Sequence, residues 1–421
     1  MKKRRVDMQN NEKVNIWHNS VPVEKSSYIN ENNIIIYNEE NFKLEKDKPT
    51  MIDLFCGAGG FSVGCELAGF QSVLGTDWFE PSLETWRYNH PNAISILGDI
   101  KNITPDLLVE TLRSAGVKKI NLITGGVPCQ GFSRANRKHN DDDERNFLFR
   151  DYMKIAEAFQ PDYLIVENVS GMQTTAGGKF VEEILGSMEE LGYSSTVKLL
   201  NAADYGVPQI RKRLIFVGIK RNRGLADKFT YPEPQFMEIG KQVGFLDLEE
   251  LKPYRTVYDA ISDLPQIESN EVSDIYTSDS LTEYQKIMRG IDDNIRFKKS
   301  EELFNHKAPK HPQDTIDKIK NTTPGMPMYE KFKQRIRLTW EKPSPTQLAG
   351  GIRPQFQFGH PSIARGLTIR ERARIQSFPD SYKFLGGTVQ ERVQTGNAVP
   401  PLMIYAVAKE IIKDLNKANN K

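Results

Sequence analysis

One cysteine of this chain stands on a loop suited to an exposed, reactive thiol. Cys129 lies within the stretch Gly125-Gly-Val-Pro-Cys-Gln-Gly-Phe-Ser133, directly after an apolar run that ends at Thr124. Glycine and proline shape such a loop and are poorly suited to a packed core. Arg211 and Arg213 would help the thiolate form if the fold brought them close, because nearby cations lower the pKa of a thiol. We therefore predict that Cys129 is a nucleophile.

A glutamate and a polar run follow later apolar segments. Glu167 comes directly after a run that we expect to be a buried strand. An acid at such a position is either an ion-paired or capping group or a catalytic one, and the sequence alone leaves both open. Alternation along the next predicted strand places Gln209, Arg211 and Arg213 on one face. Three hydrogen-bonding side chains on one inward face indicate a functional site rather than a solvent-exposed surface.

A glycine-dense turn, Asp53-Leu-Phe-Cys-Gly-Ala-Gly-Gly60, joins the first apolar run to a predicted helix. Its glycines let the backbone pass close to a ligand, and the helix N-terminus offers free N–H groups. The glycines expected to approach the ligand are Gly57, Gly59 and Gly60. Asp77 and Asp99 follow the next two apolar runs, and carboxyl ends of parallel strands meet at one ligand-binding edge. Asp53, at the start of the glycine turn, adds a third carboxylate, and three carboxylates at this edge predict an adenosine-type ligand.

The glycine turn alone does not establish a ligand site, because it is also an ordinary strand-to-helix connection. A dinucleotide cofactor is the competing functional interpretation. The spacing lacks the GxGxxG arrangement because position 62 is Ser62, which counts against a nicotinamide cofactor.

Seven short apolar runs alternate with helix-like stretches and must position these residues. The predicted strands are Met51–Phe55, Ser72–Gly75, Ala93–Leu97, Ile120–Thr124, Tyr163–Val166, Ser195–Leu200 and Leu214–Ile219. The predicted helices are Ser62–Ala68, Ser82–Asn89, Leu107–Ala115, Asp151–Phe159 and Val181–Leu191. Strands alternating with helices predict an α/β fold with a doubly wound, mainly parallel sheet.

The alternation of predicted strands and helices divides the chain into expected domains. Residues 1–47 are rich in Asn, Lys and Glu, apart from the apolar run Ile34–Tyr37, and are interpreted as an N-terminal arm or peripheral layer. Residues 48–220 carry the alternating pattern, whereas 221–385 have weak periodicity and frequent prolines. We expect this second segment to be a smaller, loop-rich domain inserted before residues 386–421 return to the first domain through a closing apolar helix, Leu402–Leu415.

Composition narrows the class of protein further. The chain has 421 residues, a formal net charge of +2, three cysteines and no long apolar stretch. These features argue against a membrane span, a disulfide scaffold and a secretory leader, so we expect a cytoplasmic protein. The six histidines show no ligand spacing, and no metal is expected. Basic clusters are local and, by themselves, are most simply solvated faces.

The ordered set of motifs resembles the DNA (cytosine-5) methyltransferase family, of the bacterial restriction-modification type. DLFCGAGGFSVG resembles the family's cofactor loop, GGVPCQGFS its nucleophile loop, and ENV with QIRKR its base-holding motifs. RGLTIRERARIQSFPD and GNAVPP are similar to its closing motifs. The matches cover most of the chain outside the N-terminal arm and residues 221 to about 340.

The resemblance implies an S-adenosyl-L-methionine-dependent methyltransferase fold and a cofactor site. In it, Phe55 and Trp78 would lie against the adenine, Asp77 would hold the ribose hydroxyls, and Asp99 and Ile100 would contact the adenine. The remaining implied cofactor contacts are Gly57, Gly59, Gly60, Pro128, Asn397 and Val399.

The resemblance also implies that a cytosine is flipped out of double-stranded DNA and methylated at carbon 5. Cys129 would attack the base, Glu167 would contact its pyrimidine edge, and Arg211 and Arg213 would support catalysis. The segment 221–385 would be the target-recognition domain. Residues expected to contact DNA are Gln130, Ser133, Gln209, Arg335, Arg337 and Arg353.

Alternatives remain at this point. A transfer-RNA cytosine-5 methyltransferase would share the chemistry, although the loop PCQGFS lacks the PPCQPFTR-like form associated with that branch. An inactive DNA-binding relative should lose Cys129 or Glu167, and both are present. A Rossmann oxidoreductase would leave the nucleophile loop and the arginines without a role. We expect a monomer that protects host DNA from a partner restriction endonuclease, an expectation that rests on the habit of the family.

Overall fold

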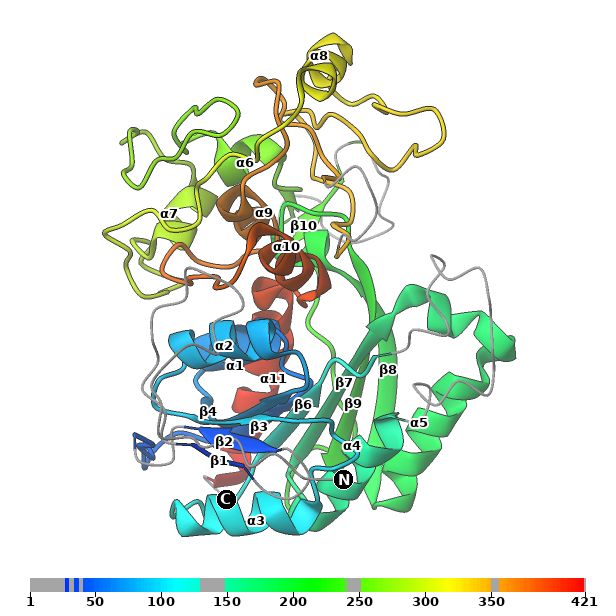
Figure 1. Ribbon diagram of the computed structural model, residues 1–421. Helices are drawn as coiled ribbons and strands as arrows, with labels where there is room; N and C mark the ends of the chain where they lie inside the picture. Colours follow the sequence, from blue (N-terminus) through cyan, green and yellow to red (C-terminus); the bar gives the residue numbers. More distant parts are fainter. Residues whose placement is uncertain are drawn as a thin grey trace, which may run out of the picture.

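A nine-stranded sheet organises the lower half of the molecule in this computed structural model (Figure 1). The structure describes residues 27–29, 34–37, 41–128, 148–238, 240, 251–349 and 356–419. The strand order is β1-β2-β5-β4-β3-β6-β7-β9-β8. Strands β5, β4, β3, β6 and β7 are parallel, whereas β9 runs antiparallel between β7 and β8. This confirms the predicted α/β fold with a mainly parallel sheet.

Each predicted strand is present, with bounds shifted by up to three residues. The central strands are almost wholly buried, because helices cover both faces of a parallel sheet. Their bounds are β3 Thr50–Leu54, β4 Gln71–Asp77, β5 Ile94–Leu97, β6 Leu122–Gly125, β7 Tyr163–Val169, β8 Tyr193–Asn201 and β9 Lys212–Lys220.

The helices between these strands lie on opposite faces of the sheet. Figure 1 shows α1 and α2 above the sheet and α3 below it, and the C-terminal helix α11 packs against α1. The bounds are α1 Gly60–Ala68, α2 Glu80–Asn89, α3 Pro105–Ser114, α4 Leu148–Phe159, α5 Lys179–Glu190 and α11 Pro401–Asn419. The C-terminal helix therefore lies against the helix that follows β3.

Part of the segment expected to be an N-terminal arm belongs to the sheet. Strand β2, Ile35–Tyr37, pairs antiparallel with β5, and β1, Ser27–Ile29, pairs with β2. These two strands form the sheet edge beside β5. The run Ile34–Tyr37 is apolar because it packs onto this edge, where Ile34 and Ile36 are each 1% exposed.

The upper half holds the loop-rich segment and short helices (Figure 1). Its elements are the strand pair β10 Phe236–Met237 and β11 Lys252–Pro253, and the helices α6 Val257–Ile261, α7 Glu283–Arg289, α8 Gln313–Asn321, α9 Ile369–Ile375 and α10 Thr388–Asn397. Short 3-10 turns lie at Ser170–Gln173, Thr175–Gly178 and Ala202–Tyr205. One buried apolar cluster runs from the sheet through α11 to α6, α7 and α9, so the two halves share a core.

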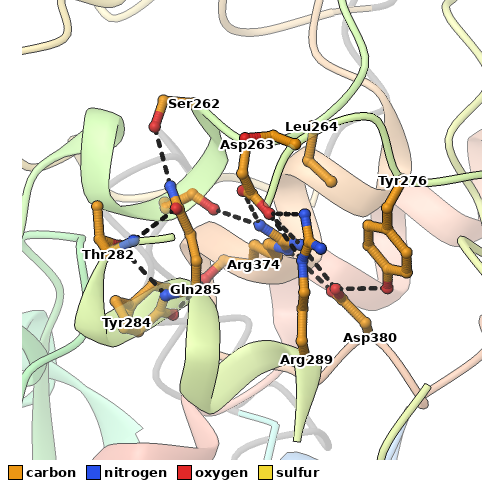
Figure 2. Close-up of polar contacts among 12 residues, drawn as sticks. Ser262, Asp263, Leu264, Tyr276, Thr282, Tyr284, Gln285, Arg289, Arg374 and Asp380 are labelled. Atoms are coloured by element: carbon orange, nitrogen blue, oxygen red, sulfur yellow. Dashed lines mark hydrogen bonds and ion pairs between the residues drawn. The ribbon is translucent and has the colours of Figure 1, made fainter. Parts of the chain in front are cut away.

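A buried ion-pair network links α9 to the loop-rich segment (Figure 2). The Arg374 guanidinium donates to both oxygens of Asp380, at 2.8 and 2.6 Å, and also pairs with Asp263. Asp263 accepts from Arg289 as well, at 2.6 and 3.0 Å, and Tyr276 donates to Asp380 at 2.7 Å. Satisfied buried charges of this kind fix one arrangement of the segments that carry them.

No helix in the described part of the chain is both long enough and apolar enough to span a bilayer.

Candidate active site

Glu167 and Arg213 form an ion pair at the carboxyl end of β7. The Nε atom of Arg213 lies 2.6 Å from Oε1 of Glu167, and each side chain is 12% exposed. The two residues are diagonal neighbours on one face of the β7–β9 ladder, because Glu167 is opposite Ile215 and Arg213 is opposite Val169. The sheet register thus brings together two residues that the sequence predicted as one site.

The same carboxylate faces the start of the nucleophile loop. A Cβ atom placed on Gly126 would lie 3.7 Å from Oε2 of Glu167. The neighbouring Asn168 amide donates to the carbonyl oxygen of Val127 at 3.1 Å, which ties β7 to the segment that follows β6. Pro128, the last described residue before the loop, is half-buried. The acid therefore lies beside the chain that leads directly into Cys129.

Four predicted site residues lie outside the described part of the chain. They are Cys129, Gln130, Ser133 and Arg353.

Arg211, predicted to support catalysis, is buried and bonds to backbone carbonyl groups. It is 1% exposed, and burial holds the pKa of its guanidinium well below the ordinary value. Its terminal nitrogens donate at 3.0 Å to the carbonyl oxygens of Gln347 and Gly396. Arg211 therefore joins the approach to β9 to the chain that carries Asn397.

Gln209 lies before strand β9 rather than on its predicted face. The expected strand face is wrong for Gln209 and Arg211, because β9 begins at Lys212. Gln209 is fully buried, and its amide bonds to Gln376 at 2.5 Å and to the N–H group of Gln347 at 2.9 Å. Its hydrogen-bonding groups are therefore used inside the protein.

The glycine turn between β3 and α1 has the backbone that glycine permits. Gly57 and Gly59 adopt φ of +52° and +86°, and Phe55, half-buried, also has a positive φ of 56°. A Cβ atom on Gly60 would lie 2.1 Å from the carbonyl oxygen of Val399, so the chain end crosses directly over this turn. A Cβ atom on Gly57 would meet nothing within 4 Å. The turn therefore offers open space to a ligand at Gly57 and backbone contact at Gly60.

The residues that follow β4 and β5 surround this turn. Asp77 accepts from the N–H groups of Gly57 at 2.8 Å and Phe79 at 2.7 Å, and burial raises the pKa of its carboxyl. Trp78 is 69% exposed, which is unusual for so large an apolar ring. Asp99 is exposed and Ile100 is buried, at the corresponding end of β5. Carboxylate, free indole face and glycine turn thus gather at one edge of the sheet.

The third carboxylate expected to face a ligand points inward instead. Asp53 is fully buried and accepts from the Ser62 hydroxyl at 2.6 Å and the Thr124 hydroxyl at 2.8 Å. Burial raises the pKa of its carboxyl to about 6. Asp53 therefore ties β3 to α1 and β6, and it supports the turn from beneath.

Sequence reasoning missed two residues that hold the turn. The Tyr382 hydroxyl donates to the carbonyl oxygen of Ala58 at 2.7 Å, and a Cβ atom on Gly59 would clash with that hydroxyl. His90 lies 3.4 Å from the same hydroxyl and 2.9 Å from Glu66. Their sequence separation explains the omission, since nothing local in the chain connects position 382 with position 58. Asn397 is exposed at the end of α10, near this crossing.

Two arginines predicted to contact DNA have partners within the chain. The guanidinium of Arg337 donates to carbonyl oxygens, including those of Thr322 at 3.1 Å and Ser362 at 3.2 Å. Arg335 is 4% exposed, and its guanidinium lies 4.7 Å from the centroid of the Phe332 ring. The structure gives both side chains a role in organising the loops of the upper half.

Comparison with known proteins identifies the class. The fold resembles a solved structure described as a DNA modification methyltransferase encoded within an E. coli prophage, with a TM-score of 0.71, 24% identity, and coverage of 88% of this chain and 100% of that one. The profile of the C-5 cytosine-specific DNA methylase family matches residues 49–413.

Curated relatives agree with this match. The chain is 34% identical to the Type II methyltransferase M1.HphI of Haemophilus parahaemolyticus, over 86% of this chain and 87% of that protein. It is 32% identical to the Type II methyltransferase M.AgeI of Thalassovita gelatinovora, over 86% and 98%. The fold is thus that of the α/β S-adenosylmethionine-dependent methyltransferases. The chain belongs to the C-5 cytosine-specific DNA methylase family, and it is a C-5 cytosine DNA methyltransferase of the Type II modification kind.

Proposed function

We propose that the protein transfers a methyl group from S-adenosylmethionine to a cytosine flipped out of a specific sequence in double-stranded DNA, with Cys129 as nucleophile and Glu167 and Arg213 as its partners. The observation that carries this proposal is the Glu167–Arg213 pair beside Gly126. A carboxyl group and a guanidinium lie where the nucleophile loop begins, at the carboxyl edge where ligands bind in parallel sheets.

The chemistry accounts for each residue type. Carbon 5 of cytosine is a weak nucleophile, and thiolate attack at carbon 6 pushes electron density onto it. Glu167 contacts ring nitrogen 3 and supplies a proton there, while Arg213 stabilises charge that builds on the carbonyl oxygen. Carbon 5 then takes up the methyl group, a proton acceptor removes the carbon-5 proton, and the thiolate leaves carbon 6. These contacts require the cytosine to lie outside the stacked DNA helix.

The other two cysteines support the assignment of Cys129. Cys56 is 6% exposed and Cys65 is fully buried. Burial raises the pKa of both thiols well above the ordinary value. Because the thiolate is the reactive form, neither of them is suited to attack a base.

The turn between β3 and α1 fits the methyl donor that the family implies. Trp78 offers an exposed aromatic face, Asp77 a carboxylate, and Gly57 open space. When bound, S-adenosylmethionine supplies an electrophilic methyl group. Phe55, Asp99, Ile100 and Val399 would enclose the adenosine, while Asn397 and Pro128 lie on the segments that approach from the chain end and from β6.

We further propose that residues 221–385 recognise the target sequence, and that the protein works as a cytoplasmic monomer beside a restriction endonuclease of the same specificity. The Type II names of the relatives support this pairing. The buried Gln209 and the backbone-bonded Arg337 are less suited to contact DNA than exposed side chains.

Bisulfite mapping tests the proposal. The protein is incubated with S-adenosylmethionine and unmethylated mixed-sequence DNA, and converted strands are sequenced. We expect 5-methylcytosine at one recurring short sequence. Methylation of transfer RNA but not of DNA would instead favour the RNA substrate, and no methyl transfer to either would refute the proposal.

A further inference from the structure

Strand β2 reaches two segments that carry proposed cofactor contacts. It forms the antiparallel neighbour of β5, with Ile35 opposite Leu97 and Tyr37 opposite Ser95. Strand β5 leads into Asp99, and helix α2, which begins two residues after Trp78, packs over β4 and β5. A strand at this edge can therefore influence the position of both segments.

The first contact lies under the turn that carries Asp99. A Cβ atom on Gly98 would lie 3.1 Å from Cγ1 of Ile34, closer than side chains normally approach. Ile34 is 1% exposed. Gly98 does not adopt a left-handed backbone, so the absent side chain reflects space rather than conformation. Ile34 therefore fills the place beside Gly98 and fixes the turn that precedes Asp99 and Ile100.

The second contact holds helix α2. The guanidinium of Arg87 stacks 3.7 Å from the centroid of the Tyr37 ring, and Arg87 is 5% exposed. Its Nε and one terminal nitrogen have no hydrogen-bond partner among the described residues. Burial lowers the pKa of this guanidinium. The aromatic face is therefore a main attraction between this buried cation and β2.

We propose that β2, together with Ile34 directly before it, is a positioning element of the cofactor site, in which Ile34 sets the Gly98–Asp99 turn and Tyr37 sets helix α2 and hence Trp78. This inference rests on the proposed use of S-adenosylmethionine. Neither residue touches the cofactor, so both act through the segments that do. Loss of either contact weakens cofactor binding without changing DNA affinity.

Equilibrium binding tests the proposal, with S-adenosylmethionine titrated by calorimetry and DNA by fluorescence anisotropy. We expect Tyr37→Leu to raise the Kd for S-adenosylmethionine about three- to tenfold. Tyr37→Phe keeps the aromatic face and should bind like the wild type. Both variants should retain wild-type affinity for DNA.

Ile34 is tested by exchange of volume with Gly98. Gly98→Ala should raise the Kd for S-adenosylmethionine, because the new methyl group presses on Ile34. The double variant Gly98→Ala/Ile34→Ala should recover most of the lost affinity, which general destabilisation would not produce. Ile36→Ala serves as control, since Ile36 is equally buried on β2 and should lower thermal stability without changing the Kd.

The outcomes separate this inference from the proposed function. If the wild type binds no S-adenosylmethionine, the proposed function fails and this inference falls with it. If the wild type binds and the Tyr37→Leu and Gly98→Ala variants bind equally well, the inference alone is overturned. A parallel loss of affinity in Ile36→Ala would assign the effect to stability and would likewise overturn it.

Discussion

The carbonyl oxygen of Val399 occupies the space that a side chain of Gly60 would need, since a Cβ atom there would lie 2.1 Å away. The two residues are 339 positions apart, yet they form one crossing of backbone on backbone. Glycine at position 60 therefore allows the backbone of Val399 to approach the turn closely. The chain end thereby becomes part of the wall of the proposed cofactor site, which explains why a closing segment is needed for a site that begins near the N-terminus.

Gly60→Ala should damage both stability and cofactor binding. The added methyl group meets backbone atoms, which cannot rotate away, so we expect a loss of about 1–3 kcal/mol in the free energy of unfolding. Urea denaturation and calorimetric titration with S-adenosylmethionine measure the two effects. A variant with wild-type stability and affinity would show that the crossing is looser than described.

Gly57→Ala should affect binding more than stability. Gly57 has φ of +52° and open space around it, so alanine costs about 1–2 kcal/mol of backbone strain. Its methyl group would also occupy space assigned to the ligand. Gly69→Ala is the matched control, because Gly69 has φ of +114° and open space but lies at the far end of α1. Equal binding by the two variants would contradict the assigned ligand position.

Glu167→Gln should strongly reduce turnover but spare cofactor binding. Glutamine keeps the shape but cannot supply the proton or the charge that pairs with Arg213 at 2.6 Å. We expect methyl transfer to fall about 10²- to 10⁴-fold. Filter-binding assays with labelled S-adenosylmethionine measure transfer, and calorimetry measures affinity. Glu183→Gln, which removes the exposed partner of Arg150, is the control and should retain full activity.

Arg374→Met should destabilise the protein strongly. The variant leaves Asp263 and Asp380 buried beside each other with one cation fewer (Figure 2). Removing one partner of a buried pair costs about 3–5 kcal/mol, which urea denaturation would detect. Lys413→Ala breaks an exposed pair with Glu410 and should cost less than 1 kcal/mol. Similar losses from both variants would contradict the importance of the buried network.

Acid should destabilise the protein partly through His360. Its Nδ1 atom accepts from the N–H groups of Ser362 at 3.2 Å and Ile363 at 3.1 Å, so protonation breaks both bonds. Burial lowers the pKa of His360 from 6.5 to about 4. Between these values the unfolded chain binds a proton that the folded protein does not, so this contribution to stability falls as pH falls.

The variant His360→Asn isolates this effect. Asparagine can accept the same hydrogen bonds but does not titrate. Asp53 and Glu391, whose carboxyl pKa values are raised to about 6 and about 7, act in the opposite sense in both proteins and cancel in the comparison. From pH 6.5 to 4 the wild type should lose about 1–3 kcal/mol more than the variant. If stability falls equally with pH in the wild type and the variant, His360 does not contribute to the acid sensitivity of the protein.

The sequence allowed the core of the fold to be predicted because buried strands of a parallel sheet are continuous apolar runs. Glu167 and Arg213 could be paired as one site because both follow from the motifs and the strand order. The misplacement of Gln209 has a local cause, since β9 begins only at Lys212. Alternation is a reliable guide inside a strand and fails in the approach to it.

Other features depend on contacts distant in sequence. The carbonyl groups that receive Arg337 lie on segments 15 to 25 residues away, so a solvent-facing arginine and an internal one look alike in the chain. The apolar run Ile34–Tyr37, which contains the three-residue strand β2, is too short to predict a sheet strand by itself, and β2 joins the sheet through its pairing with β5.

Trapping on modified DNA tests the central assignment most directly. Fluorine at carbon 5 of cytosine takes the place of the proton that must be removed, so elimination cannot follow methyl transfer and the sulfur stays bonded to carbon 6. With 5-fluorocytosine at the mapped target and S-adenosylmethionine present, mass spectrometry should find the DNA attached to the peptide that contains Cys129. Cys129→Ser should give no adduct, and Cys65→Ala should give a full one. An adduct on any other residue, or an undiminished yield from Cys129→Ser, would contradict the account.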